Sequence, residues 1–394
     1  MRKHFSTKTA CRIIIWMIAC TSGVNAATPY VPITPKTIVS KLPQTIAGSG
    51  SIQQAETKNI TEARNQALEH ITYAQRSGDA RHFGYALGIL KRWQHGETLP
   101  DELHVPMAMA QQALHRFDAA LDTLKPHLSR HPEDAQAWLI RAGIEQVQGR
   151  YAAARRSCEQ LLGRSTTLVE ISCVAWTERY TANAQTAYQA LRSAVQRATT
   201  TDDSALNWSL MLLAELAEIN ADYDYAEQVL HWAIERTGDD IRPLTALADL
   251  QLRRGDTKTL LAMIDPDNPS PALRMRRMLA LIQQGTLPGD QQLTWLRQHF
   301  DAGNRRERPL HQRDAAIANL YLLNEPRKAF EYALGNWQEQ REFADVEILL
   351  STALAIGERT RIKDALAWLD ETQFTDPRIN PLRQGLSEER DDAS

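Results

Sequence analysis

The stretch EQVQGRYAAARRSCEQLL, residues 145–162, places a glycine, an aromatic residue and a run of alanines between two segments that favour helix. Gly149 accepts backbone angles that other residues avoid, so it suits a tight turn between two helices. The alanines after Tyr151 favour a second helix that packs closely against the first. The stretch therefore predicts a helix–turn–helix unit.

The same arrangement recurs along the chain at intervals of about 34 residues. When Ala135 is position 1 of a unit, Gly149 falls at position 15 and Tyr151 at position 17. Small residues recur where two helices would touch, and large apolar residues recur around that contact. Further units begin at Asp101, Leu168, Asn207 and Ile241.

These positions resemble the tetratricopeptide (TPR) repeat, a helix–turn–helix unit of that period. The resemblance implies an all-α fold, a TPR-like helix-turn-helix solenoid coiled as a right-handed superhelix, over residues 56–374. The repeats are clearest over residues 101–264. Pro106 inside a first helix and Arg141 at a usually apolar position alter the unit boundaries but not the class. A helical solenoid of another repeat family is the alternative.

The N-terminus has the layout of a secretory signal peptide, residues 1–26. A basic run is followed by the short apolar run IIIWMIAC, and small residues Val24 and Ala26 precede the expected cleavage site. An apolar run this short does not span a bilayer. We therefore predict an exported bacterial protein of the periplasm. Two alternatives remain, a retained N-terminal anchor and an outer-membrane lipoprotein that is lipidated at Cys20.

Composition distinguishes the segments on either side of the repeats, and net charge indicates which class of partner the chain can bind. Residues 27–55 are rich in Pro and Gly and predict a linker, and residues 375–394 predict a loose charged tail. The formal net charge is −3, and cleavage after Ala26 would remove basic residues only. A mildly acidic chain lacks the basic face that nucleic acid requires. We expect a protein or peptide partner, no nucleic acid, and membrane attachment only through Cys20 or a retained signal.

Two cysteines, Cys158 and Cys173, would remain after cleavage of the signal peptide. Cys158 falls on the second helix of one unit and Cys173 on the first helix of the next, and such helices are neighbours in a stacked array. An exported protein with paired thiols favours a disulfide. Two small buried thiols are the other interpretation, because free cysteine is often buried.

The sequence offers little that points to catalysis or to a cofactor. It has no H-E-x-x-H, G-x-S-x-G, phosphate-binding glycine loop or C-x-x-C pattern. His127 and His131 have the spacing of two metal ligands on one helix face, but Pro132 suggests that the helix is ending and no third ligand follows nearby. We therefore predict no metal, no cofactor and no catalytic residue.

The resemblance also implies where a partner would bind, on a concave face lined by the first helix of each unit. Carried onto this sequence, the candidate binding residues are Glu102, Met109, Gln112, Gln136, Leu139, Gln146, Trp176, Arg179, Tyr180, Trp208, Met211, Glu215, Glu218, Arg242, Asp249 and Arg253. We predict a non-catalytic adaptor for assembly, secretion or maturation of a cell-envelope component. The alternatives are a structural outer-membrane lipoprotein and an enzyme built on an α-solenoid.

Overall fold

The chain separates into two units, residues 1–55 and residues 56–394. The computed structural model describes residues 59–96, 98–198, 203–238, 240–304 and 312–388. The predicted signal peptide, Cys20 and the predicted linker therefore lie outside the described residues.

Nineteen α-helices, numbered α2 to α20, make up most of the described residues, which contain no β-strand beyond an isolated bridge between His95 and Thr98. The first six helices are α2 (Ile60–Ser77), α3 (Arg81–Lys91), α4 (Asp101–Ala113), α5 (Phe117–Arg130), α6 (Ala135–Val147) and α7 (Tyr151–Glu159). They are followed by α8 (Thr167–Glu178), α9 (Ala184–Gln196), α10 (Asp203–Ile219), α11 (Tyr223–Thr237), α12 (Ile241–Arg254), α13 (Thr257–Met263), α14 (Pro271–Gln283) and α15 (Asp290–Asn304). The last helices are α16 (Gln312–Tyr321), α17 (Pro326–Trp337), α18 (Phe343–Ile356), α19 (Lys363–Glu371) and α20 (Asn380–Glu388), with short 3₁₀ turns η1 (Thr360–Ile362) and η2 (Pro377–Ile379).

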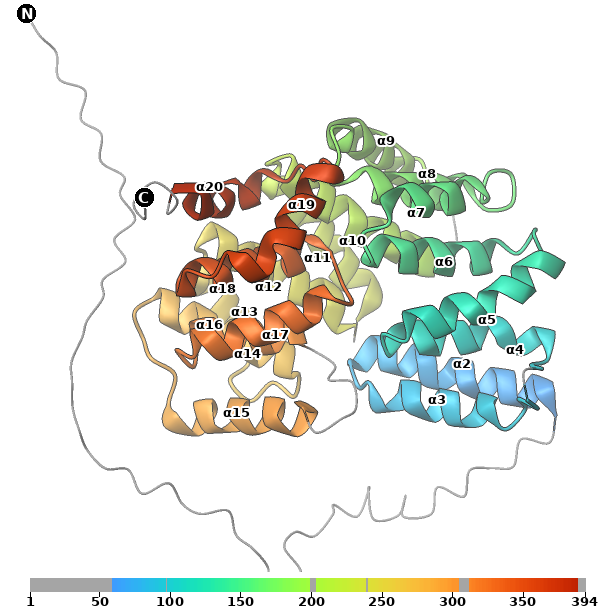
Figure 1. The fold of residues 1–394 in the computed structure, drawn as a ribbon, viewed down its shortest axis with the longest axis horizontal. Coiled ribbons are helices and arrows are strands. Elements are labelled where there is room, and N and C mark those ends of the chain that lie inside the picture. Colours follow the sequence, from blue (N-terminus) through green and yellow to red (C-terminus); the bar gives the residue numbers. More distant parts are fainter. Residues whose placement is uncertain (1–58, 97, 199–202, 239, 305–311, 389–394) are drawn as a thin grey trace, which may run out of the picture. The chain divides into compact units, whose positions relative to one another are not determined.

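Consecutive helices pack as pairs, for example α4 on α5, α6 on α7 and α10 on α11. The turn inside several of these pairs carries a residue with positive φ, which is 54° at His115, 72° at Gly149 and 72° at Gly255. Ala142 and Ala154 are fully buried, as small residues at helix contacts should be. The predicted TPR-like helix-turn-helix solenoid is confirmed, and Figure 1 shows the helices following one another in chain order.

The C-terminal segment differs from the prediction of a loose tail from residue 375. Residues Pro377–Ile379 and Asn380–Glu388 are helical, and the side chains of Ile379 and Leu386 are buried. The prediction of a loose tail was wrong over these residues. It was based on the Pro and charge content, but apolar residues between the charged ones pack into the core. The charged residues beyond α20 lie outside the described part.

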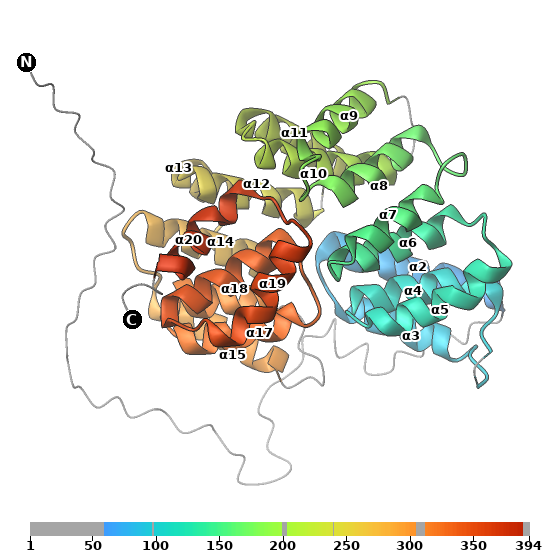
Figure 2. The ribbon, with the colours of Figure 1, turned by 45° about the horizontal axis from the view of Figure 1, so that its top comes forward.

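The C-terminal helices also pack against the middle of the solenoid. One hydrophobic cluster joins Tyr180 and Ile219 to Phe330, Trp368 and Phe374. These residues are far apart in sequence. The C-terminal helices therefore share a hydrophobic core with the middle of the solenoid, in addition to packing on the helices next to them in the chain. Helix α20 packs on α18, and Figures 1 and 2 show the two next to each other.

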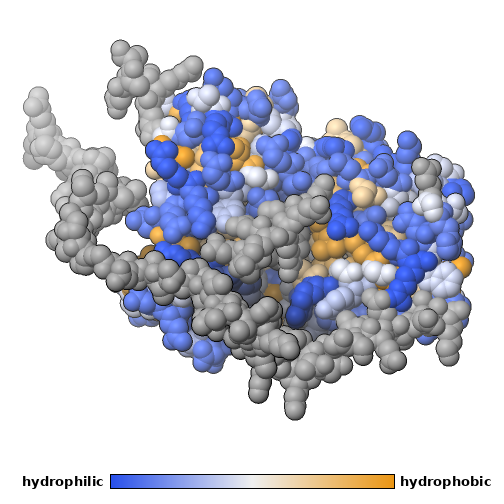
Figure 3. Space-filling model, turned by 60° about the horizontal axis from the view of Figure 1, so that its bottom comes forward, coloured by the Kyte–Doolittle hydropathy of each residue, from blue (hydrophilic) through white to orange (hydrophobic). Residues whose placement is uncertain are grey.

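The surface gives no sign of a membrane-spanning element in the part that the structure describes. Figure 3 shows one face, on which hydrophilic residues dominate and hydrophobic residues form separate areas between them. None of the described helices is long and apolar enough to cross a bilayer.

Candidate functional site

The loop between α17 and α18 lies against the ends of α6 and α8. The backbone N–H of Arg341 donates to the Val147 carbonyl at 2.7 Å, and the Tyr151 hydroxyl donates to the Arg341 carbonyl at 3.3 Å. The side chain of Glu342 accepts a bond from Arg179. We call residues 341–345 the docked segment, because both backbone polar groups of Arg341 are bound by the solenoid.

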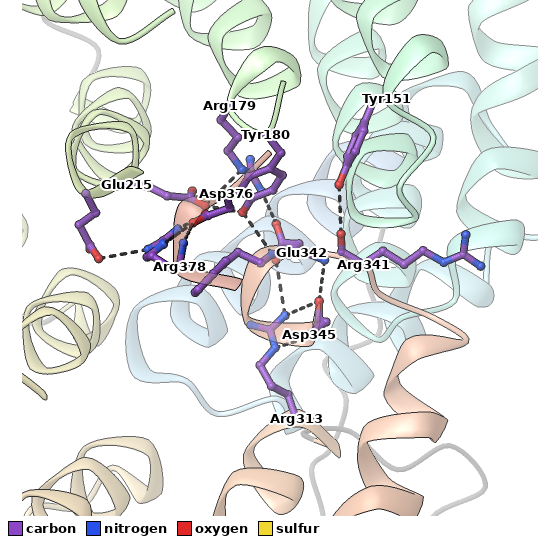
Figure 4. A network of polar contacts seen from close by, with 12 residues as sticks. Tyr151, Arg179, Tyr180, Glu215, Arg313, Arg341, Glu342, Asp345, Asp376 and Arg378 are labelled. Carbon is purple, nitrogen blue, oxygen red and sulfur yellow. Dashed lines mark hydrogen bonds and ion pairs between the residues drawn. The ribbon is translucent and has the colours of Figure 1, made fainter. Parts of the chain in front are cut away.

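Arg179 and Tyr180, at the end of α8, form the centre of this contact (Figure 4). Arg179 is 1% exposed, its Nη2 donates to Glu342 Oε1 at 2.8 Å, and its Nε lies 3.2 Å from Glu215 Oε1. The Tyr180 hydroxyl donates to Glu215 Oε1 at 2.5 Å and accepts from the Phe343 N–H at 3.3 Å. Two consecutive residues that follow α8 thereby bind both α10 and the docked segment.

The charges of this cluster compensate one another. Burial alone would lower the pKa of Arg179, but Glu215 and Glu342 outweigh it and raise that pKa. Burial would raise the pKa of Glu342, but Arg179 and Arg313 outweigh it and lower that pKa. Arg179 and Glu342 therefore each favour the charged form of the other.

A second contact lies beside the first and involves the segment that precedes α20. Arg378 is held by Asp376, whose Oδ1 accepts from Arg378 Nε at 2.9 Å, and it lies 3.6 Å from the centroid of the Phe343 ring. Its Nη1 also donates to Glu218 Oε2 at 3.3 Å, and Glu218 accepts from Arg253 Nη2 at 2.5 Å. Helices α10 and α12 are thus connected to the C-terminal segment through one buried carboxylate.

The structure divides the sequence-predicted binding residues by exposure. The buried ones are Gln146, Arg179, Tyr180 and Glu218. The half-buried ones are Met109, Gln112, Leu139, Trp176, Trp208, Met211, Glu215 and Asp249. The exposed ones are Glu102, Gln136, Arg242 and Arg253.

The expectation that all of these residues line an open face was wrong for Gln146, Arg179, Tyr180 and Glu218, which are buried. The docked segment and the residues before α20 cover Arg179, Tyr180 and Glu218. Other candidates pack within the stack, such as Trp176 and Trp208, whose rings meet edge to face with centroids 5.6 Å apart. The central helices therefore recognise a segment of this same chain.

An open apolar groove lies elsewhere, along α8 between α7 and α9. Its volume is about 360 Å³, and Ile171, Val174 and Ala175 of α8 face Ala187 and Ala190 of α9 across it. In the unit that begins at Leu168, Ile171 and Val174 occupy repeat positions at which large apolar residues usually fill the interior, but both are only half-buried. The reason is the shortness of α7, which has 9 residues where α5 has 14, so it leaves part of α8 uncovered.

The rim of the groove is polar and fixed in place. The Glu178 carboxylate pairs with Arg155 and accepts from Asn183 Nδ2 at 2.8 Å and from Thr181 Oγ1 at 2.9 Å. Burial would raise the pKa of Glu178, but these hydrogen bonds and Arg155 outweigh it and lower that pKa. A charged pair thus lies beside an apolar floor.

The disulfide between Cys158 and Cys173 joins α7 to α8, with their Cα atoms 5.5 Å apart. Both residues are buried in a cluster with Ala142 and Leu161. The bond fixes the helix on one side of the groove to the helix that forms its floor. Leu162, which follows this cluster and is 60% exposed, also lines the groove.

The groove combines an apolar floor with a few polar side chains. The polar lining residues are Arg155, Glu170, Glu178, Asn183 and Thr186. A small set of polar groups around an apolar floor fixes the orientation of a ligand.

Comparisons with known proteins support no closer assignment. No protein-family model matches the chain, and no curated protein matches it. The solved structures with a similar arrangement include a human IFIT1 dimer with m7Gppp-AAAA, with 12% identity, a TM-score of 0.40 and coverage of 87% of this chain and 82% of that one. They also include the P58(IPK) TPR domain, with 15% identity, a TM-score of 0.23 and coverage of 82% and 96%. These values are too low to transfer a site or a ligand.

Proposed function

We propose that the protein is an exported, non-catalytic scaffold that binds an apolar segment of a partner protein. The partner would belong to the assembly, secretion or maturation of a cell-envelope component. The observation that supports this proposal is the apolar groove along α8, about 360 Å³ in volume, with exposed Leu162 at its edge.

A groove along a helix suits the apolar side of an amphipathic helix. Such a ligand places side chains at positions i, i+3 or i+4, and i+7 into the groove. The floor formed by Ile171, Val174 and Ala190 would bury these side chains, and Arg155 and Glu178 at the rim would bind polar groups beside them. Because the central helices already bind the docked segment, the groove along α8 remains for a partner.

Two features favour export. The first 26 residues have the layout of a signal peptide, and disulfides such as the one between Cys158 and Cys173 form and persist in oxidising compartments. Lipidation at Cys20 is the alternative route to the envelope. Unchanged membrane fractionation of a Cys20→Ala variant, together with the absence of lipid labelling, would rule this alternative out.

The test selects peptides from a display library on the immobilised mature chain and measures their affinity for groove variants. We expect enriched peptides with apolar residues at helical spacing. Ala190→Arg should weaken them at least about tenfold, because it places a charge in the groove, and Leu162→Ala should weaken them less. Leu287→Ala is the matched control, because Leu287 is 83% exposed and does not line the groove.

A single-stranded RNA probe forms the second arm of this test. We expect no RNA binding at physiological salt, because the chain carries a net negative charge. Two results together would overturn the proposed function: tight binding of RNA, and equal affinity of the selected peptides for Ala190→Arg and for the unaltered protein.

A further inference from the structure

Metal-ligating side chains gather where α4 begins and α5 ends. Asp101 and His104 lie on the first turn of α4, and His127 lies on the last turn of α5. Because α4 packs on α5, residues more than twenty positions apart meet here. One potential ligand atom from each of the three residues lies within 4.8 Å of those of the other two.

The ring of His127 shows that this cluster is more than a chance meeting of polar residues. His127 is 6% exposed, and its Nε2 lies 2.8 Å from Asp134 Oδ2. Its Nδ1 is buried and has no hydrogen-bond partner. A buried polar atom without a partner destabilises the fold, and a bound ion would supply that partner.

The hydrogen bond to Asp134 is the type of contact that orients a metal-binding histidine. Ligating histidines usually donate their other ring N–H to a carboxylate or carbonyl, which fixes the tautomer. With Nε2–H donating to Asp134, the lone pair of His127 is on Nδ1. Asp134 is itself held in place, because its Oδ1 accepts from the Ala137 N–H at 3.0 Å as the N-cap of α6.

The other two side chains complete a set of imidazole and carboxylate ligands. His104 is 4% exposed, and its Nδ1 lies 3.1 Å from the Pro100 carbonyl oxygen, which leaves the lone pair on Nε2. The Asp101 side chain is 45% exposed, so an ion can reach it from solvent. Asp101 Oδ1 accepts from Arg130 Nε at 3.1 Å, and Oδ2 lies 3.4 Å from His131 Nε2, so His131 is next to the cluster.

We propose that Asp101, His104 and His127 bind a zinc ion, with His131 or a water molecule as the fourth ligand. Imidazole and carboxylate groups are zinc ligands, and zinc takes four of them in a tetrahedron with bonds of about 2.0–2.2 Å. The ligand atoms would approach to about 3.3 Å from one another, which tetrahedral bonds of that length require. The ion would tie α4 to the end of α5 and, through Asp134, to α6.

The sequence predicts no metal at His127 and His131, because no third ligand follows nearby and Pro132 indicates the end of the helix. In the structure α5 does end at Arg130, but its pairing with α4 supplies Asp101 and His104 as further ligands.

The experiment titrates the untagged, chelator-stripped mature chain with zinc by isothermal calorimetry and counts bound zinc after dialysis. We expect one equivalent at this site and a higher melting temperature with zinc. Asp101→Asn and His104→Gln should each weaken binding at least about tenfold, and Asp134→Asn should weaken it about 10- to 100-fold. His231→Ala, at an exposed histidine on α11, is the control and should leave binding unchanged.

Cobalt provides a readout that does not depend on stability. Co²⁺ in this site should give the visible absorption of a tetrahedral nitrogen–oxygen centre, and Asp101→Asn should reduce it. Asp101 is a surface residue, so this variant remains informative if the variants of the buried histidines fail to fold. Absence of zinc binding below about 10 μM, or binding equal in Asp101→Asn, His131→Ala and the unaltered chain, would overturn the proposal.

Discussion

Gly149 lies directly against the indole of Trp368, so that a Cβ added at Gly149 would come within 2.5 Å of Trp368 Cζ2. Gly149 forms the turn between α6 and α7, whereas Trp368 belongs to α19. One residue therefore serves two purposes, since its φ of 72° makes the turn and its missing side chain lets a distant helix approach.

Gly149→Ala should lower the melting temperature strongly. The positive φ costs a residue with a Cβ on the order of 1 kcal/mol, and the clash with Trp368 adds about 1–3 kcal/mol. Gly255→Ala is the matched control, because Gly255 also has a φ of 72° but has no atom within 4 Å of an added Cβ. Equal losses of melting temperature in the two variants would show that Trp368 does not pack on Gly149.

Arg179→Ala should destabilise the fold by about 3–5 kcal/mol, the usual effect of removing one partner from a buried ion pair. The substitution leaves the Glu215 and Glu342 carboxylates without their buried cation. Chemical unfolding in urea would measure the change. Arg361→Ala removes an exposed arginine that pairs with Glu331, and we expect it to change the unfolding midpoint little. Comparable shifts in the two variants would contradict the central role of Arg179.

The stability of the fold should depend on the ionisation of Glu342 in acid. Its pKa is lowered in the folded state, so its contribution is fully present above the unfolded value of about 4.3 and is lost as the pH falls through the lower folded value. Asp345 and Glu218 have the opposite effect on the pH dependence of stability, because burial raises their pKa values in the folded state.

A Glu342→Gln variant isolates this contribution from the opposing ones. It should be less stable at pH 7 than the unaltered chain, and the difference should shrink as the pH falls from about 5 to about 3. Urea unfolding at several pH values would measure the difference. Glu325→Gln, at a residue of the α16–α17 connection, is the control. A difference that stays constant across this pH range would refute the assigned ionisation of Glu342.

The local pattern was sufficient to predict the helix pairs. Gly149 marks a turn and Ala154 a close helix contact, and both signals depend only on residues within one unit. Such signals repeat with the unit, so they identify a solenoid before any contact is known. They carry no information on which distant units touch.

The contacts that cover the central helices could not be predicted for this reason. Arg179 and Glu342 are 163 positions apart, and nothing in the sequence around Glu342 distinguishes it from other surface carboxylates. The groove along α8 could not be predicted either, because Ile171 and Val174 occupy repeat positions that the pattern predicts to be interior. Only the early end of α7 at Glu159 leaves them open.

The disulfide between Cys158 and Cys173 gives the last prediction. It closes a loop with a sequence separation of 15, which should stabilise the fold by about 3 kcal/mol through restriction of the unfolded chain. Adding a reductant should therefore lower the urea midpoint of the protein. The Cys158→Ala/Cys173→Ala double variant should not respond to the reductant, which separates loss of the bond from general effects. Reduction should also weaken peptide binding, because α7 would no longer be fixed to the floor of the groove. Two alkylatable thiols in the unreduced, denatured protein, detected by mass spectrometry, would show that the bond does not form.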